Sequence, residues 1–186
     1  MPPRIIEKVK GFVMHPVEAF RNARSDDPGD VLKYFVVLLA INLTLLTIFI
    51  IGWLFSYTLT SGGNAAALVF DGITFVIGEL IGGTVLFFLA CMVFHLFVAL
   101  VVGGKSIEQT FRALAYGATP GLLLGWIPLI GLIAWIWTAA LVIIGVRELH
   151  ETSTLRAAVA VLLPVAILVV LFFVMLFALV MVRGGV

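Results

Sequence analysis

Residues 157–182 read AAVAVLLPVAILVVLFFVMLFALVMV, a run of 26 residues in which no side chain is charged or forms hydrogen bonds. An α-helix needs only about 20 apolar residues to cross the ~30 Å hydrocarbon core of a bilayer. This stretch therefore predicts a membrane-spanning helix, which we expect to be kinked at Pro164.

Four further apolar segments precede this one, at about residues 31–59, 73–102, 107–127 and 128–146. The whole chain of 186 residues is 63% hydrophobic and only 11% charged, which is far too apolar for a soluble domain. The sequence thus predicts an all-α, polytopic transmembrane helical bundle with five spans. We divide it into an N-terminal segment, 1–30, and a five-helix transmembrane domain, 31–186.

The ends of these segments carry recognisable signals. Asp30 is a suitable N-cap for the first span, and Ser61-Gly62-Gly63-Asn64 ends that span. The third segment is short and moderately apolar, so a re-entrant segment is its alternative. Ser106-Ile-Glu-Gln109 reads as a capping box at its start, and Pro128 suits the first position of the fourth span. Residues 65–71 either lie flat on the outer surface or extend the second span.

Lysine and arginine positions predict the orientation. Cytoplasmic stretches carry an excess of these residues in multi-pass proteins. With five spans and a cytoplasmic N-terminus, ten of the eleven lie inside, namely Arg4, Lys8, Lys10, Arg21, Arg24, Lys33, Lys105, Arg112, Arg147 and Arg156. Only Arg183 lies outside, so we expect a multi-pass protein of the cell membrane with its C-terminus outside.

The N-terminal segment has its own amphipathic pattern. Within residues 4–14, Ile5, Val9 and Phe12 share one helical face, and Lys8 and Lys10 lie on the other. This pattern is typical of a short helix in the membrane interface, with its basic face towards anionic headgroups. A disordered basic tail is the alternative.

Glycines recur at helical spacing in two of the predicted spans. The second span contains Gly78 and Gly82, and the third contains Gly117, Gly121 and Gly125 together with Pro120. Helices in lipid associate through close backbone approach at such small residues. We interpret these glycines as helix-packing positions.

Three polar side chains are candidate functional residues. Glu79 lies within the second span, where a carboxylate has either a packing or capping role or a place on an ion or proton path. His95 lies 16 residues further along the same helix, about 160° away in projection, so the two cannot share one site on that helix. We interpret His95 as a structural histidine.

The third candidate is His150, in the stretch Arg147-Glu-Leu-His-Glu151. A solvated helix end explains this stretch better than a metal or proton site. The single cysteine, Cys91, excludes a disulfide within the chain. We find no catalytic motif, no cofactor-binding fingerprint and no metal signature. The basic residues lie beside the membrane, which favours lipid over nucleic acid as their partner.

Several motifs resemble the Yip domain family, named after eukaryotic membrane proteins that interact with GTPases of the Rab/Ypt class. They are Arg112-Ala-Leu-Ala-Tyr116, Pro120 within GATPGLLLGW, Pro128-Leu-Ile-Gly131, Trp137 and Gly145 to His150. His15-Pro16-Val-Glu-Ala-Phe20 resembles the start of prokaryotic, archaeal-like members. The resemblance implies five spans and a cytoplasmic N-terminus. Eukaryotic members carry a longer N-terminal region with an Asp-Leu-Tyr-Gly-Pro-type motif, which residues 1–30 lack, so GTPase binding is not carried over.

Two functions remain open at this stage. The first is a non-enzymatic membrane scaffold that associates with itself or with other membrane proteins, favoured by the glycine faces and the family resemblance. The alternative is a small transporter or channel for protons or cations, favoured by Glu79, the short third segment and Pro164.

Overall fold

The computed structural model describes residues 5–61, 65–103 and 106–183, and these regions contain helices and no strand. The helices in chain order are α1 (Ile5–Met14), α2 (Pro16–Asn22), the 3₁₀ helix η1 (Ala23–Ser25), α3 (Pro28–Ser61), α4 (Ala65–Val102), α5 (Ile107–Gly117), α6 (Thr119–Leu124), α7 (Ile130–Leu149) and α8 (Thr154–Arg183). The predicted all-helical class is confirmed.

Four helical segments of the described chain are long and apolar enough to cross a membrane: Pro28–Gly52, Val69–Val102, Ile130–Leu149 and Thr154–Met181. They correspond to four of the five predicted spans. The predicted third span, 107–127, is divided into α5 and α6 at Ala118. Pro120 has no N–H to continue the helical ladder, and the Thr119 hydroxyl donates instead to the Tyr116 carbonyl at 2.5 Å.

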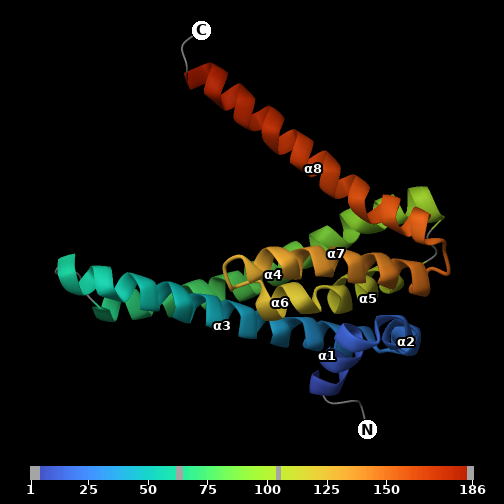
Figure 1. Cartoon of the computed structure of the whole chain (residues 1–186), viewed down its shortest axis with the longest axis horizontal. Helices are drawn as coiled ribbons and strands as arrows, with labels where there is room; N and C mark the ends of the chain where they lie inside the picture. The colour runs from blue at the N-terminus through green and yellow to red at the C-terminus, as the bar shows by residue number, and fades with distance from the viewer. Residues whose placement is uncertain (1–4, 62–64, 104–105, 184–186) are drawn as a thin grey trace.

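Two antiparallel hairpins make up the bundle (Figure 1). α3 packs against α4, and the pair α5–α6 packs against α7. In the second hairpin the helices approach each other most closely at three glycines. An added Cβ atom would contact α7 at each of them: Val142 from Gly117, Thr138 from Gly121 and Trp135 from Gly125. The partners run backwards along α7, so α5–α6 lies antiparallel to α7 along most of its length.

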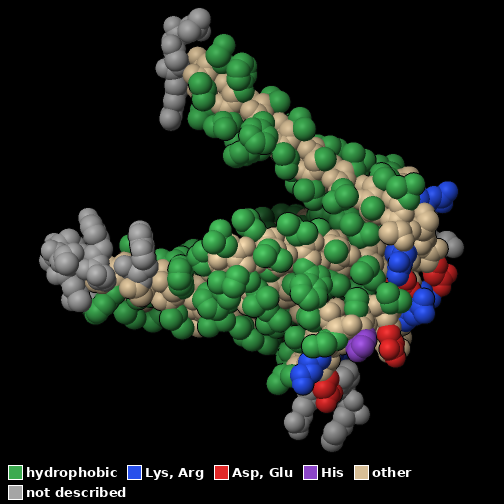
Figure 2. Space-filling view, in the orientation of Figure 1, with side chains coloured by type: hydrophobic (Ala, Val, Ile, Leu, Met, Phe, Trp, Pro, Cys, Tyr) green, Lys and Arg blue, Asp and Glu red, His purple; other side chains and the backbone are tan. Residues whose placement is uncertain are grey.

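Helix α8 leaves the bundle at an angle after contacting α4 and α7 (Figure 1). Every residue from Val165 to Met181 is exposed, although nearly all are large and apolar. The space-filling view shows the same apolar surface along the bundle, with charged side chains gathered at one end (Figure 2). Such a surface is stable only with lipid as its solvent.

The buried core lies near the charged end. Its largest fully buried side chains include Tyr34, Tyr116, Phe20 and Leu38. They come from α2, α3 and α5, so the N-terminal helices are packed into the bundle. Phe12 of α1 is also buried.

Some predicted helix boundaries are wrong. α3 begins at Pro28, and Asp27 rather than Asp30 accepts the capping hydrogen bond, from the Gly29 N–H at 2.8 Å. α7 begins at Ile130, because Pro128 belongs to the preceding turn, in which the Ile130 N–H donates to the Pro128 carbonyl at 2.8 Å. Residues 65–71 extend α4. The turn predicted at 61–64 falls largely outside the described residues.

The capping box predicted at Ser106 does not form, since Ser106 makes no side-chain capping hydrogen bond. The Gln109 side chain donates instead to the backbone carbonyl of Arg24 at 3.3 Å. A tertiary contact with η1 therefore replaces the local cap, and the Ser106 hydroxyl is left without a capping role.

Candidate functional site

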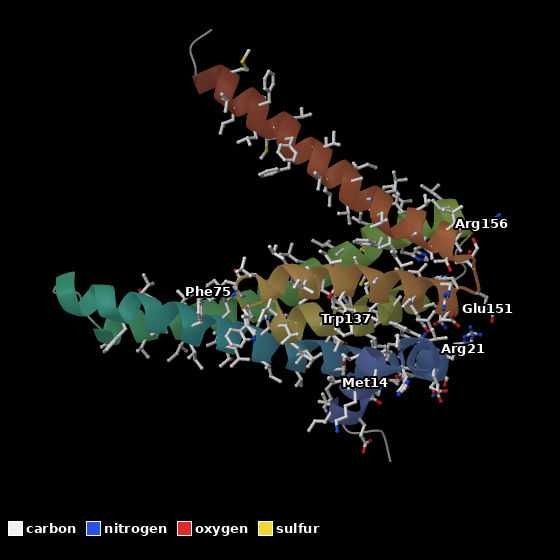
Figure 3. All side chains as sticks on the ribbon, in the orientation of Figure 1. Met14, Arg21, Phe75, Trp137, Glu151 and Arg156 are labelled. Atoms are coloured by element: carbon white, nitrogen blue, oxygen red, sulfur yellow. The ribbon has the colours of Figure 1, made fainter. Side chains whose placement is uncertain are left out.

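The charged end of the bundle brings together residues from nearly the whole chain. We call it the polar end: α1, α2 and η1, the beginnings of α3, α5 and α8, and the last turns of α4 and α7. Figure 3 shows Arg21, Glu151 and Arg156 at this end, although they come from α2, the α7–α8 turn and α8. The polar end therefore joins the N-terminal segment to the membrane-spanning helices.

Asp26 is the centre of one cluster. Its Oδ2 atom accepts hydrogen bonds from Lys8 Nζ at 2.7 Å and from the Tyr116 hydroxyl at 2.5 Å. Its backbone carbonyl accepts two more, from Arg112 Nε at 3.0 Å and Nη2 at 2.7 Å. The Arg112 side chain is almost fully buried and also lies 3.4 Å from Glu108. One residue thus fastens both α1 and α5 to the link before α3.

Aromatic rings fill the space beneath this cluster. Phe12 stacks on Tyr116 with ring centroids 4.3 Å apart, and Tyr34 meets Tyr116 edge-on at 5.1 Å. Phe20 lies against Phe12 and over Gly145, where an added Cβ would approach its ring to 2.8 Å. Offset and edge-on ring pairs contribute stability beyond the area that they bury. These contacts hold α1 and α2 against α5 and α7.

A second charged network ties the N-terminal segment to the end of α7. Arg21 pairs with Glu148 at 2.7 Å, and Arg24 pairs with Glu151 at 2.5 Å. Arg24 also donates to the Glu148 carbonyl at 2.6 Å. Arg147 lies 2.7 Å from Glu148, which therefore serves two arginines.

Two histidines meet at a buried hydroxyl. Thr110 Oγ1 lies 2.9 Å from His95 Nδ1 and 3.1 Å from His150 Nε2. A hydroxyl has a single proton to donate, so at least one of the two histidines presents its N–H to Thr110. Burial, and then the neighbouring His95, lower the pKa of His150 to about 4. The predicted solvated helix end describes the exposed Glu151, whereas the His150 ring is half-buried and bonded to Thr110 of α5.

A cavity of about 360 Å³ opens beside His150. Its polar lining comes from four places in the chain and includes Arg24, Ser106, Gln109, His150, Glu151 and Arg156. The Oε1 atom of Gln109 is buried and accepts no hydrogen bond within the described part of the chain. This cavity combines cationic groups with hydrogen-bonding side chains at the level where α4, α5, α7 and α8 end or begin.

The other sequence candidates lie elsewhere. Glu79 is exposed on α4, far along the helix from His95. Gly78 is also exposed and Gly82 is half-buried, and a Cβ atom on either would meet nothing within 4 Å in the described part of the chain. Pro120 is buried beside the contact between α6 and α7.

Sequence reasoning missed most of the polar end. Asp26, Thr110 and Tyr116 were not candidates, and the sequence places Lys8 on a face towards headgroups rather than beside Asp26. The only signal was the segment from Arg112 to Tyr116, whose two polar ends, four residues apart, fall on one helical face. No group of three or more histidine, cysteine or acidic residues in the described regions could hold a metal ion.

The family model of the Yip1 domain matches residues 10–176. The match includes all four candidate spans up to the last turns of α8, and the polar end apart from the first half of α1. No curated protein and no solved structure matches the chain.

Proposed function

Because this chain belongs to the Yip1 domain family, we propose that it is a non-enzymatic membrane scaffold that associates with itself or with other membrane proteins. Its apolar exterior and four candidate spans make it a multi-pass membrane protein. The scaffold role itself depends on one observation, the open glycine face of α4.

Gly78 and Gly82 lie one turn apart on α4 with no atom near the position of a Cβ. The glycines of α5 and α6, by contrast, are in close contact with α7. Small residues spaced in this way allow two helix backbones to approach closely, and close packing drives helix association in lipid. The open pair therefore supports docking of a helix from another molecule.

Glu79 lies between these glycines in the sequence and is exposed, as Gly78 is. A carboxylate facing lipid is costly, and burial against a polar group of a partner helix would reduce that cost. This gives Glu79 a role in association rather than in transport. The transport alternative has less support, because Glu79 faces away from the bundle interior, where a path would run.

We also propose five crossings with a cytoplasmic N-terminus. α5–α6 lies antiparallel to α7, and its 18 residues extend about 27 Å at 1.5 Å each, close to the thickness of a hydrocarbon core. If α7 crosses the bilayer, then α5–α6, which lies beside it, occupies the same hydrocarbon layer. The polar end carries most of the lysine and arginine residues, which favours the cytoplasmic side.

The experiment is single-molecule photobleaching of labelled protein in liposomes over a wide range of protein-to-lipid ratios. We expect oligomers that increase with protein density, and their loss in the double variant Gly78→Leu with Gly82→Leu. Gly52→Leu is the matched control, since Gly52 is an open glycine on α3. Wild-type protein that stays monomeric at every density and retains no membrane protein partner would refute the scaffold proposal. Equal effects of the two substitutions would refute the role of the α4 face.

A flux assay separates the two functions. Proteoliposomes that conduct protons or cations above empty liposomes, with flux lost in Glu79→Gln, would favour the transporter over the scaffold.

A further inference from the structure

The charged side chains that line the cavity beside His150 do not balance. Arg24 and Arg156 line it, opposed by the single carboxylate of Glu151. His150 is uncharged at neutral pH because its pKa is low. The lining therefore has one positive charge more than its acidic group neutralises.

Arg156 is the free cation of this set. Its guanidinium makes no ion pair or hydrogen bond within the described regions, whereas Arg24 is paired with Glu151. That pair is largely exposed, with 42% and 73% of the two side chains accessible, so it contributes little stability and can rearrange around an anion. Arg156 is thus available to a ligand. Arg24 becomes available through Nη1 when Glu151 moves away, while its Nη2 keeps the bond to the Glu148 carbonyl.

The neutral groups of the cavity suit the same kind of ligand. Ser106, which makes no capping hydrogen bond, offers its hydroxyl at the start of α5. The cavity also borders the start of α8, so the positive ends of two helix dipoles lie beside it.

The depth of the cavity restricts the source of that ligand. Candidate spans end or begin beside it at Val102, Leu149 and Thr154, so it lies at the level of the lipid headgroups. Headgroups carry phosphodiesters with one negative charge, which matches the single excess positive charge. Arginine binds phosphate oxygens by charge-assisted hydrogen bonds.

We propose that this cavity binds the phosphate of an anionic phospholipid, with Arg156 and Arg24 as its cationic ligands. The shared chemistry is a phosphate oxyanion, and inorganic phosphate is the other source of it. This site is separate from the glycine face of α4 and does not depend on the scaffold proposal.

The test is native mass spectrometry of the full chain in mild detergent, titrated with phosphatidylglycerol or phosphatidylcholine. We expect one saturable phosphatidylglycerol site, with phosphatidylcholine weaker by about tenfold, because its trimethylammonium group repels the arginines and donates no hydrogen bond. Arg156→Gln should weaken phosphatidylglycerol binding by about tenfold or more, and Arg156→Lys should retain most of it.

Lys33→Gln is the matched control, because Lys33 is an exposed cation at the start of α3 that does not line the cavity. Equal loss of binding in Arg156→Gln and Lys33→Gln, or equal binding of the two lipids by the wild type, would overturn the proposal. Competition by inorganic phosphate that depends on Arg156 would support the phosphate site and identify the soluble anion as a second source. Phosphate binding with no lipid binding would overturn the lipid assignment. Circular dichroism of each variant verifies that it is folded.

Discussion

Substitution of Asp26 by asparagine tests whether the N-terminal helices are fastened to the bundle through this residue. The change removes the charge and leaves the shape of the side chain. Its carboxylate is the shared acceptor for Lys8 and the Tyr116 hydroxyl. The backbone bonds from Arg112 to the carbonyl of residue 26 remain possible.

The magnitude follows from the burial of the two partners. The side chains of Lys8 and Asp26 are only 14% and 25% exposed, so water screens their pair weakly. A hydrogen bond to a charged group contributes about 1.5–3 kcal/mol and a neutral one about 1 kcal/mol. Weakening both bonds in this way lowers the free energy that holds α1 against the bundle by about 2 kcal/mol. The fraction of molecules with α1 detached then rises about thirtyfold.

Limited trypsin digestion measures that fraction. Cleavage after Lys8 or Lys10 requires α1 to open, and its rate follows the open population when reclosing is fast. Asp27→Asn is the control, because among the described residues the exposed Asp27 carboxylate accepts only a local bond, from the Gly29 N–H. A cleavage rate in Asp26→Asn that equals the rate in Asp27→Asn would refute this account of how α1 is held.

Two further predictions concern the helices themselves. Because the pKa of His150 is about 4 when folded, below its ordinary 6.5, the unfolded chain takes up a proton first and stability falls between pH 6.5 and 4. With allowance for the partial exposure of His150, we expect the free energy of unfolding to fall by about 2 kcal/mol over this pH range. The fall is measured as a drop in Tm with pH that is smaller in His150→Asn. Equal dependence of Tm on pH in the wild type and the variant would contradict the prediction. Gly117→Ala should destabilise by about 1–3 kcal/mol, since its Cβ would lie 2.6 Å from Val142. Gly52→Ala should be neutral or stabilising, because its Cβ meets nothing and alanine favours the helix; Tm values in detergent that rank the two alike would contradict the packing.

The membrane class and the long helices were predictable from the sequence. Runs such as 157–182 cannot be stable in water, and their length matches a bilayer, so no tertiary information is needed to identify them. The break between α5 and α6 was less predictable. Pro120 indicated a lost hydrogen bond, but only the bond from Thr119 to Tyr116 shows where the ladder is interrupted.

The composition of the polar end could not be predicted. His95, Thr110 and His150 meet although 15 and 40 residues separate the bonded pairs. Asp26 reaches Tyr116 across 90 residues. Periodicity gives the apolar face of each helix, whereas the rotation and depth of one helix against another decide which polar groups meet.

The glycines show the same division most clearly. By sequence alone, Gly78 and Gly82 carry the same packing signal as Gly117 and Gly121. In the folded chain one pair is open to the surroundings and the other is closed against α7. The sequence determined that these helices can approach others closely, because a residue without a side chain permits it. The tertiary structure decided which of them already has its partner within the chain, because packing energy depends on the atoms that face each glycine and not on its spacing.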